Sequence, residues 1–181
     1  MANVAHKTND PVEVHLSVNT PEFDPGTWII NPPSLQALLN GAVPRAYWKI
    51  TPGQDDVVEM DAGEKAAVDA AALPDQKTAK IKGFAAETQT FVVVEGYDQT
   101  DQTYLTALMA DASIQGLANR LAYIQGALAW INAVQATYGA AKAACTAAAD
   151  KSALDAVTMD LSVHTGTNPN VTTEGALAIL D

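Results

Sequence analysis

Short stretches of alternating apolar and polar residues near the start of the chain predict β-strands. The alternating apolar residues are Val12, Val14, Leu16 and Val18. We therefore expect a half-buried strand over 12–18. A second short strand is expected at 27–30, where two prolines end the run. Ser34 is placed to cap a short helix over 35–39, which Gly41 ends.

The next segment has the pattern of a hairpin followed by a helix. The apolar runs 46–50 and 57–60 flank a loop, 51–56, that is rich in Pro, Gly and Asp, so they predict two paired strands. Asp61 and Glu64 are spaced as in a capping box. A helix should therefore begin at this point.

The course of that helix is less certain from the sequence. Good helix formers extend to Leu73, and Pro74 is expected either to interrupt the helix or to start a new one at its first turn. The stretch 76–90 is compatible with a helix. The β-branched run 91–94, followed by Glu95 and Gly96, predicts a strand.

Spacings of three and four apolar residues predict a helical region over about 103–149. The seam consists of Ile114, Leu121 and Leu128 at heptad positions a and of Leu117, Ile124 and Ile131 at positions d. Tyr123 and Trp130 widen this apolar stripe. We predict that these eight residues form an interface between copies of the chain.

Charged residues are scarce along these helices. Between Gln102 and Ala149 the charged residues are Asp111, Arg120 and Lys142, whereas an exposed coiled coil carries Glu and Lys beside its seam. We therefore expect the region to be covered on more than one side, by a bundle within the chain or by copies around an axis. Leu at a with Ile at d favours trimers or tetramers over dimers.

A membrane span is the alternative explanation for this uncharged stretch. Residues 121–141 carry no charge and are long enough to cross a bilayer. Gln125, Asn132, Gln135 and Thr137 interrupt them, and we therefore expect no membrane span.

These patterns together predict an α+β fold. We expect a small β-rich N-terminal part with a hairpin over 1–60, which we interpret as an attachment part. A predominantly helical bundle, 61–150, serves oligomerisation, and a short C-terminal tail, 151–181, follows.

Composition narrows the classes of partner. The 181 residues are 48% hydrophobic and 17% charged, and the net charge is −11. An acidic surface repels nucleic acid and anionic lipid, so we expect neither as a partner. The single cysteine, Cys145, excludes an internal disulfide. The N-terminus lacks an export pattern, which predicts a chain made and kept in a cytosol.

Few residues suggest chemistry, and we predict no catalytic residue and no cofactor. His6, His15 and His164 show no metal-binding spacing and are expected to be solvated. Cys145 is expected to be a packed side chain rather than a nucleophile. Five aromatic residues are candidates for a carbohydrate or peptide groove: Trp28, Tyr47, Trp48, Tyr123 and Trp130. Positions in the core are favoured for them over such a groove.

Charged clusters leave some alternatives open. One acidic cluster consists of Asp55, Asp56, Glu59 and Asp61, and another of Asp98 and Asp101. For both acidic clusters we favour structural roles in turns and helix caps. Binding of a cation by these carboxylates is the alternative. The short basic run of Lys77, Lys80 and Lys82 is expected to be a solvated helix face.

The hairpin-helix segment resembles a module of tailed-bacteriophage virion proteins. In that module a Tyr-Trp-Lys strand pairs with a Val-Val-Glu-Met strand, and a Glu-Lys-Ala-Ala-Val-Asp-Ala-Ala helix follows. Here these are residues 47–49, 57–60 and 64–71. The resemblance covers about a fifth of the chain. It implies a structural protein of a virion, assembled in the bacterial host cytoplasm: a tail fibre, head fibre or accessory subunit that contacts other virion proteins.

Two other functions remain open. The chain is alternatively a fibre-assembly chaperone or adaptor that binds another protein and leaves no stable place in the particle. A glycan hydrolase is the third reading, because paired carboxylates such as Asp98 with Asp101, or Asp55 with Glu59, perform that chemistry in other enzymes.

Overall fold

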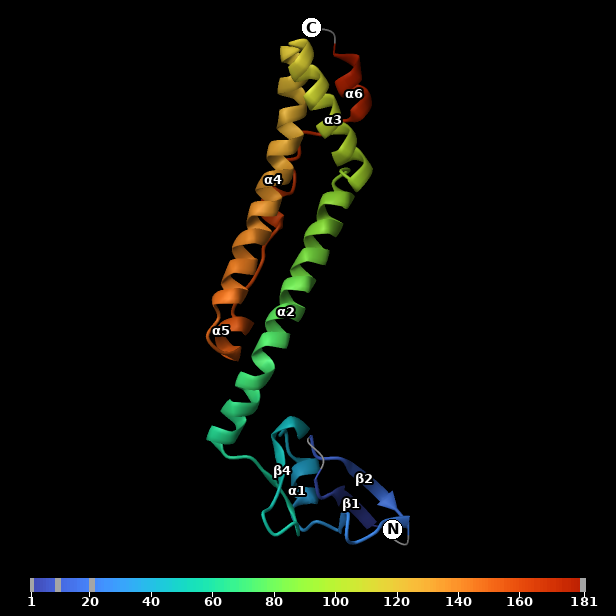
Figure 1. The fold of residues 1–181 in the computed structure, drawn as a ribbon, viewed down its shortest axis with the longest axis vertical. Helices are drawn as coiled ribbons and strands as arrows, with labels where there is room; N and C mark the ends of the chain where they lie inside the picture. Colours follow the sequence, from blue (N-terminus) through green and yellow to red (C-terminus); the bar gives the residue numbers. More distant parts are fainter. Residues whose placement is uncertain (1, 9–10, 20–21, 180–181) are drawn as a thin grey trace. The chain divides into compact units, whose positions relative to one another are not determined.

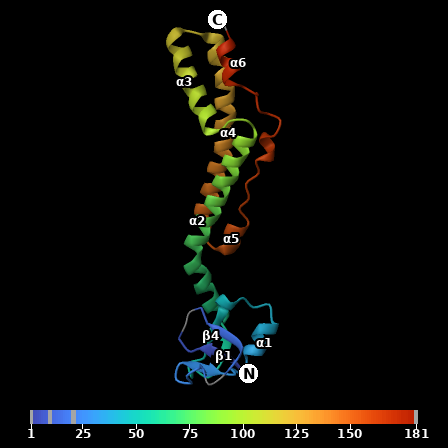
Figure 2. The same cartoon turned by 90° about the vertical axis from the view of Figure 1, so that its right-hand side faces the viewer.

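The computed structural model describes residues 2–8, 11–19 and 22–179, which form two units, Met1–Ala72 and Leu73–Asp181 (Figures 1 and 2). The first unit holds two small sheets, and the second is mostly helical. The predicted α+β class, with a β-rich N-terminal part followed by a helical bundle, is confirmed. The division between the units falls inside helix α2 (Ala62–Val94), whereas the sequence patterns suggested a boundary at 60.

The first sheet has the strand order β2-β1-β3, with antiparallel pairing on both sides of β1. Its strands are β1 (Ala2–His6), β2 (Val14–Val18) and β3 (Trp28–Ile30). The last two were predicted, and the central strand β1 was not. Leu16 is 46% exposed, because the pairing register shifts beside it. There Ser17, at φ +55°, donates its N–H to the Asn3 side chain.

The predicted hairpin consists of β4 (Trp48–Ile50) and β5 (Val57–Glu59), and it follows helix α1 (Leu35–Asn40) and a 3₁₀ turn at Arg45–Tyr47. Hairpin, helix and first sheet share one apolar core, made of Ala5, Val12, Leu35, Leu38, Trp48 and Val57. Ser34 stands at the start of α1 without capping it. Its hydroxyl instead donates to Asp56 at 2.6 Å.

Helix α2 (Ala62–Val94) starts at the predicted capping box. The Glu64 N–H donates to Asp61 at 2.9 Å, and the Asp61 N–H donates to Glu64 at 2.8 Å. The helix runs unbroken through Pro74, so the expected interruption is wrong. An interior proline removes one backbone hydrogen bond and costs about 3 kcal/mol. The helix is therefore held by contacts elsewhere along its length.

The strand predicted at 91–94 is wrong, because these residues form the last turn of α2. Phe91 stacks on Trp130 with ring centroids 5.9 Å apart, and Val92 is 1% exposed. Gly96, at φ +97°, then ends the helix, and its N–H donates to Val93. Packing against Trp130 of helix α4 (Ala118–Ala147) therefore outweighs the β preference of the run, and Gly96 acts as a helix cap.

Helices α3 (Gln99–Gln115) and α4 (Ala118–Ala147) form an antiparallel hairpin (Figure 1). Gly116 adopts the left-handed conformation between them, at φ +73°. A single continuous heptad seam from Ile114 to Ile131 is therefore wrong. Ile114 belongs to α3, and Leu117 occupies the N-cap position of α4.

The C-terminal segment, residues 156–172, returns along the helices from α5 (Lys151–Asp155) to α6 (Thr173–Ala178), with a 3₁₀ turn at Ser162–His164 (Figures 1 and 2). The short C-terminal tail predicted over 151–181 contains α5 and α6, and residues 180 and 181 lie outside the described residues. The main core of this unit gathers residues from α2, α3, α4, α6 and the C-terminal segment, including Val92, Leu105, Ile124, Trp130, Leu161, Val171 and Ala176.

A helix that crosses a bilayer must be both long and apolar. Among the helices of the described residues, none is long and apolar enough to do so. This agrees with the expectation of no membrane span.

Candidate functional site

The structure distributes the eight predicted interface residues over three environments. Ile124, Trp130 and Ile131 are buried inside the second unit, at 0%, 6% and 7% exposure. Leu117, Leu121, Tyr123 and Leu128 are half-buried. Ile114 is 86% exposed. Most of the predicted seam therefore packs within one chain, and its role between copies stays a prediction.

Trp130 holds the C-terminal segment to α4. Its ring lies 5.9 Å from Phe91 and 5.6 Å from Tyr97. Its indole N–H donates to the His164 carbonyl at 3.3 Å and to the Thr167 hydroxyl at 3.2 Å. A buried Trp N–H needs such a partner, so this residue serves internal packing.

Tyr97 makes a second polar contact with the same segment. Its hydroxyl donates to Asn168 at 2.9 Å and accepts from the Val171 N–H at 3.0 Å. The Asn168 amide in turn donates to the Glu95 carbonyl at 2.6 Å. Burial raises the pKa of Tyr97, and the Val171 N–H opposes that rise. No local sequence pattern predicts this network, because residues 97 and 168 are far apart in the chain.

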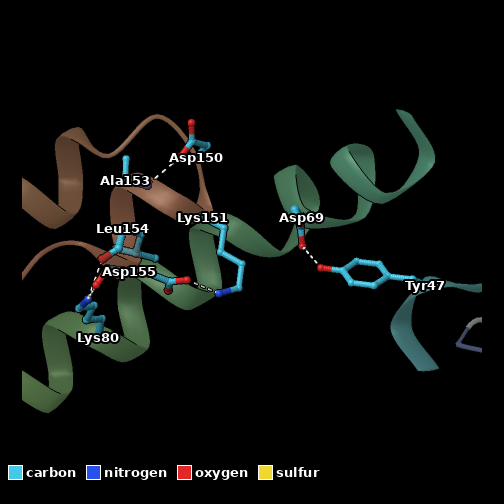
Figure 3. Close-up of polar contacts among 8 residues, drawn as sticks. All are labelled: Tyr47, Asp69, Lys80, Asp150, Lys151, Ala153, Leu154 and Asp155. Carbon is cyan, nitrogen blue, oxygen red and sulfur yellow. Dashed lines mark hydrogen bonds and ion pairs between the residues drawn. The ribbon is translucent and has the colours of Figure 1, made fainter. Parts of the chain in front are cut away.

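Two lysines of α2, Lys77 and Lys80, bind the ends of other helices, and Figure 3 shows the contacts of Lys80. The Lys80 ammonium donates to the Leu154 carbonyl at 2.6 Å and the Asp155 carbonyl at 3.2 Å. Lys77 donates to the Thr146 carbonyl near the end of α4 at 3.0 Å. Cations stabilise the unpaired carbonyls at helix C-termini. The expected solvated face is therefore wrong for these two lysines.

The acidic residues near the hairpin serve separate local contacts. Asp56 accepts from the Ser34 N–H at 2.9 Å as well as from its hydroxyl, and Asp55 accepts from Thr51 at 2.6 Å. Glu59 pairs with Lys65. Partial burial raises the pKa of Asp56, but the Ser34 hydrogen bonds outweigh it and the net shift is downward.

The second acidic cluster caps α3. Asp98 accepts from the Asp101 N–H at 2.9 Å, and the Asp98 N–H donates back to Asp101 at 3.2 Å. The backbone hydrogen bond from Asp101 is the main cause that lowers the pKa of Asp98. Over residues 2–8, 11–19 and 22–179, no three His, Cys, Asp or Glu side chains converge as metal ligands.

His6 and His164 are half-buried and therefore less solvated than expected, whereas His15 is exposed as expected. His6 and His15 pack edge-on against Trp28, with ring centroids 4.8 and 5.3 Å apart. Phe23 completes this cluster on the first sheet. His164 is half-buried, and its Nε2 lies 2.8 Å from the Thr137 hydroxyl.

Two other candidates for chemistry, Trp48 and Cys145, are buried in the cores, at 3% and 0% exposure.

The outward faces of α3 and α4 form the candidate site. Exposed residues recur at spacings of three and four on both helices. On α3 these are Thr100, Thr103, Ala107, Ala110 and Ile114. On α4 they are Ala118, Ala122, Gln125, Ala129, Asn132, Ala136, Ala140, Ala143 and Ala147. None of these side chains is charged, and an uncharged, heptad-spaced helix face is suited to packing against another helix.

The chain was compared with known protein families, with curated proteins and with solved structures. None of the three comparisons finds a match.

Proposed function

We propose that the chain is a non-enzymatic structural protein of a bacteriophage virion, a tail-fibre, head-fibre or connecting subunit that assembles as a homo-oligomer, with a trimer favoured. The observation that carries the proposal is the uncharged outward face of α4, a helix of 30 residues. Exposed helices of soluble monomers normally carry Glu and Lys on such a face. A face without them fits contact with protein rather than with water.

The proposal also rests on the resemblance to virion proteins, and the motif residues that carry it make contacts between the hairpin and helix α2. The Tyr47 hydroxyl donates to Asp69 at 2.7 Å (Figure 3). Lys49 pairs with Glu64 at 2.6 Å, and Glu59 pairs with Lys65. The motif therefore fastens a hairpin to the start of a helix. A module of that kind suits a load-bearing protein, in which strands must stay attached to a long helix.

Two measurements test the proposal. Native mass spectrometry at micromolar protein should show a stable homo-oligomer, and a monomer would remove the claim of assembly. Mass spectrometry of purified phage particles should detect the chain in many copies per particle. Its absence from particles, with presence in the infected cell, would instead favour the chaperone or adaptor.

A further inference from the structure

Asn40 and Gly41 form the only Asn-Gly pair in the chain. Asn40 is the last residue of α1, and Gly41 is the C-cap residue that follows it. Both residues are exposed. Because glycine has no side chain, the Gly41 backbone nitrogen can approach the side-chain amide carbon of Asn40, Cγ, without the obstruction that a Cβ would cause. Asparagine is also among the chemically labile residues of proteins.

The end of α1 that carries this pair is held by few contacts. The Gly41 N–H donates to the Leu38 carbonyl at 3.2 Å, at the long end of the usual range of about 2.7–3.2 Å. The Asn40 Oδ1 accepts from the Gln36 side chain at 3.0 Å, at an exposed position, and a pair of this kind adds little to the stability of a helix.

The length of α1 also favours opening of its last turn. The helix has six residues, and Ser34 gives it no side-chain cap, whereas helices shorter than about 12–15 residues are marginal without other contacts. Exposed helix ends open locally while the rest of a protein stays folded. Such opening frees the Gly41 nitrogen and lets Asn40 leave its helical conformation.

We propose that Asn40 is a site of spontaneous deamidation in the folded protein. The Gly41 nitrogen loses its proton to solvent base and attacks Cγ of Asn40, and the bond from Cγ to Nδ2 breaks. Nδ2 leaves as ammonia, taking up the proton that Gly41 lost, and a succinimide ring joins the two residues. Water then opens the ring at one of its two carbonyls, which gives aspartate or isoaspartate. Water is the only co-reactant.

The products affect the core of the first unit. Each product carries a carboxylate at the C-terminal end of α1, where the helix dipole is negative, and isoaspartate also adds a methylene to the main chain. Leu35 and Leu38 of the same helix belong to the core that holds Trp48, and they are 1% and 9% exposed. Conversion should therefore loosen α1 from this core, whether or not the chain assembles.

Peptide mapping of the native protein after incubation at mildly alkaline pH tests the site. The peptide with residue 40 should gain the mass that exchange of NH₂ for OH gives, and should separate into aspartate and isoaspartate forms. Its rate should rise with hydroxide concentration, because the attacking nitrogen must lose a proton. Asn170 is the internal control: it is exposed outside the helices and strands, but the branched side chain of Val171 obstructs the same attack.

Two comparisons decide whether the folded protein itself reacts. Asn40→Gln should lose the conversion, because the longer side chain closes a less favourable ring. The unfolded chain in urea shows how fast the pair reacts without α1. If Asn40 keeps its amide in the native protein but loses it in urea, α1 protects the pair and the proposal is wrong. The proposal is also wrong if Asn170 converts as fast as Asn40.

The effect of conversion on the first unit is measured separately. Asn40→Asp mimics one product, and Asn40→Gln is its uncharged match at the same exposed position. Hydrogen exchange followed by mass spectrometry should show faster exchange of the α1 amides in Asn40→Asp. Equal exchange in the two variants would refute the loosening of α1.

Discussion

Tyr97→Phe removes a single hydroxyl from the network that holds the C-terminal segment. The phenylalanine ring keeps its position beside Trp130, 5.6 Å away. The hydrogen bonds to Asn168 and from Val171 are lost. The variant therefore tests the polar contacts of the segment apart from its apolar packing.

The size of the effect follows from the two partners. Val171 is buried, at 5% exposure, and leaving its N–H without an acceptor costs about 1–3 kcal/mol. The Asn168 oxygen still accepts from the Asn170 N–H at 2.8 Å. Losing the hydrogen bond from Tyr97 to Asn168 therefore adds only about 1 kcal/mol. The two losses add to about 2–4 kcal/mol. At about 4 °C per kcal/mol for a unit of this size, the melting temperature should fall by about 8–16 °C.

Denaturant unfolding followed by circular dichroism measures this loss. Tyr104→Phe is the matched control, because Tyr104 is 56% exposed and water satisfies its hydroxyl. The control should change the unfolding free energy by less than about 0.5 kcal/mol. If Tyr97→Phe changes it no more than the control does, the network does not hold the C-terminal segment.

Three further predictions concern charge and pH. Lys80→Met should speed hydrogen exchange of the α5 amides measured by mass spectrometry, because two carbonyls lose their donor, whereas Lys82→Met, at an exposed position, should not. The raised pKa of Tyr97 means that the folded state favours the neutral phenol. The stability that this gives is present below about pH 10 and should be lost as pH rises through the folded pKa. Unfolding curves of Tyr97→Phe at alkaline pH should lack this loss. The lowered pKa of Asp56 gives stability that is present above pH 3.8 and lost as pH falls through the folded pKa. Asp56→Asn should weaken that acid dependence in the fluorescence of buried Trp48.

Local sequence signals were reliable where a single element decides the structure. The capping box of Asp61 and Glu64 forms as predicted, because its two hydrogen bonds involve residues three apart. The hairpin 46–60 is likewise specified by its own strands and turn. The fold class followed from such local patterns.

The errors arise where distant contacts decide. The run 91–94 has the composition of a strand, but Phe91 stacks on Trp130, which lies 39 residues later in the sequence. From the sequence, Lys77 and Lys80 are expected on a solvated helix face. The sequence does not show that the carbonyls at the ends of α4 and α5 lie beside them in the fold. Neither partner can be identified from a single sequence.

The seam and the outward faces show why spacing alone does not identify an interface. Positions three and four apart mark one side of any helix, whether that side meets its own chain or another. In α4 the larger apolar residues, such as Ile124 and Ile131, meet their own chain, and the small uncharged residues on the opposite side stay exposed. Hydrophobicity therefore marks the internal contact, whereas the proposed assembly is argued from the absence of charge on an exposed face.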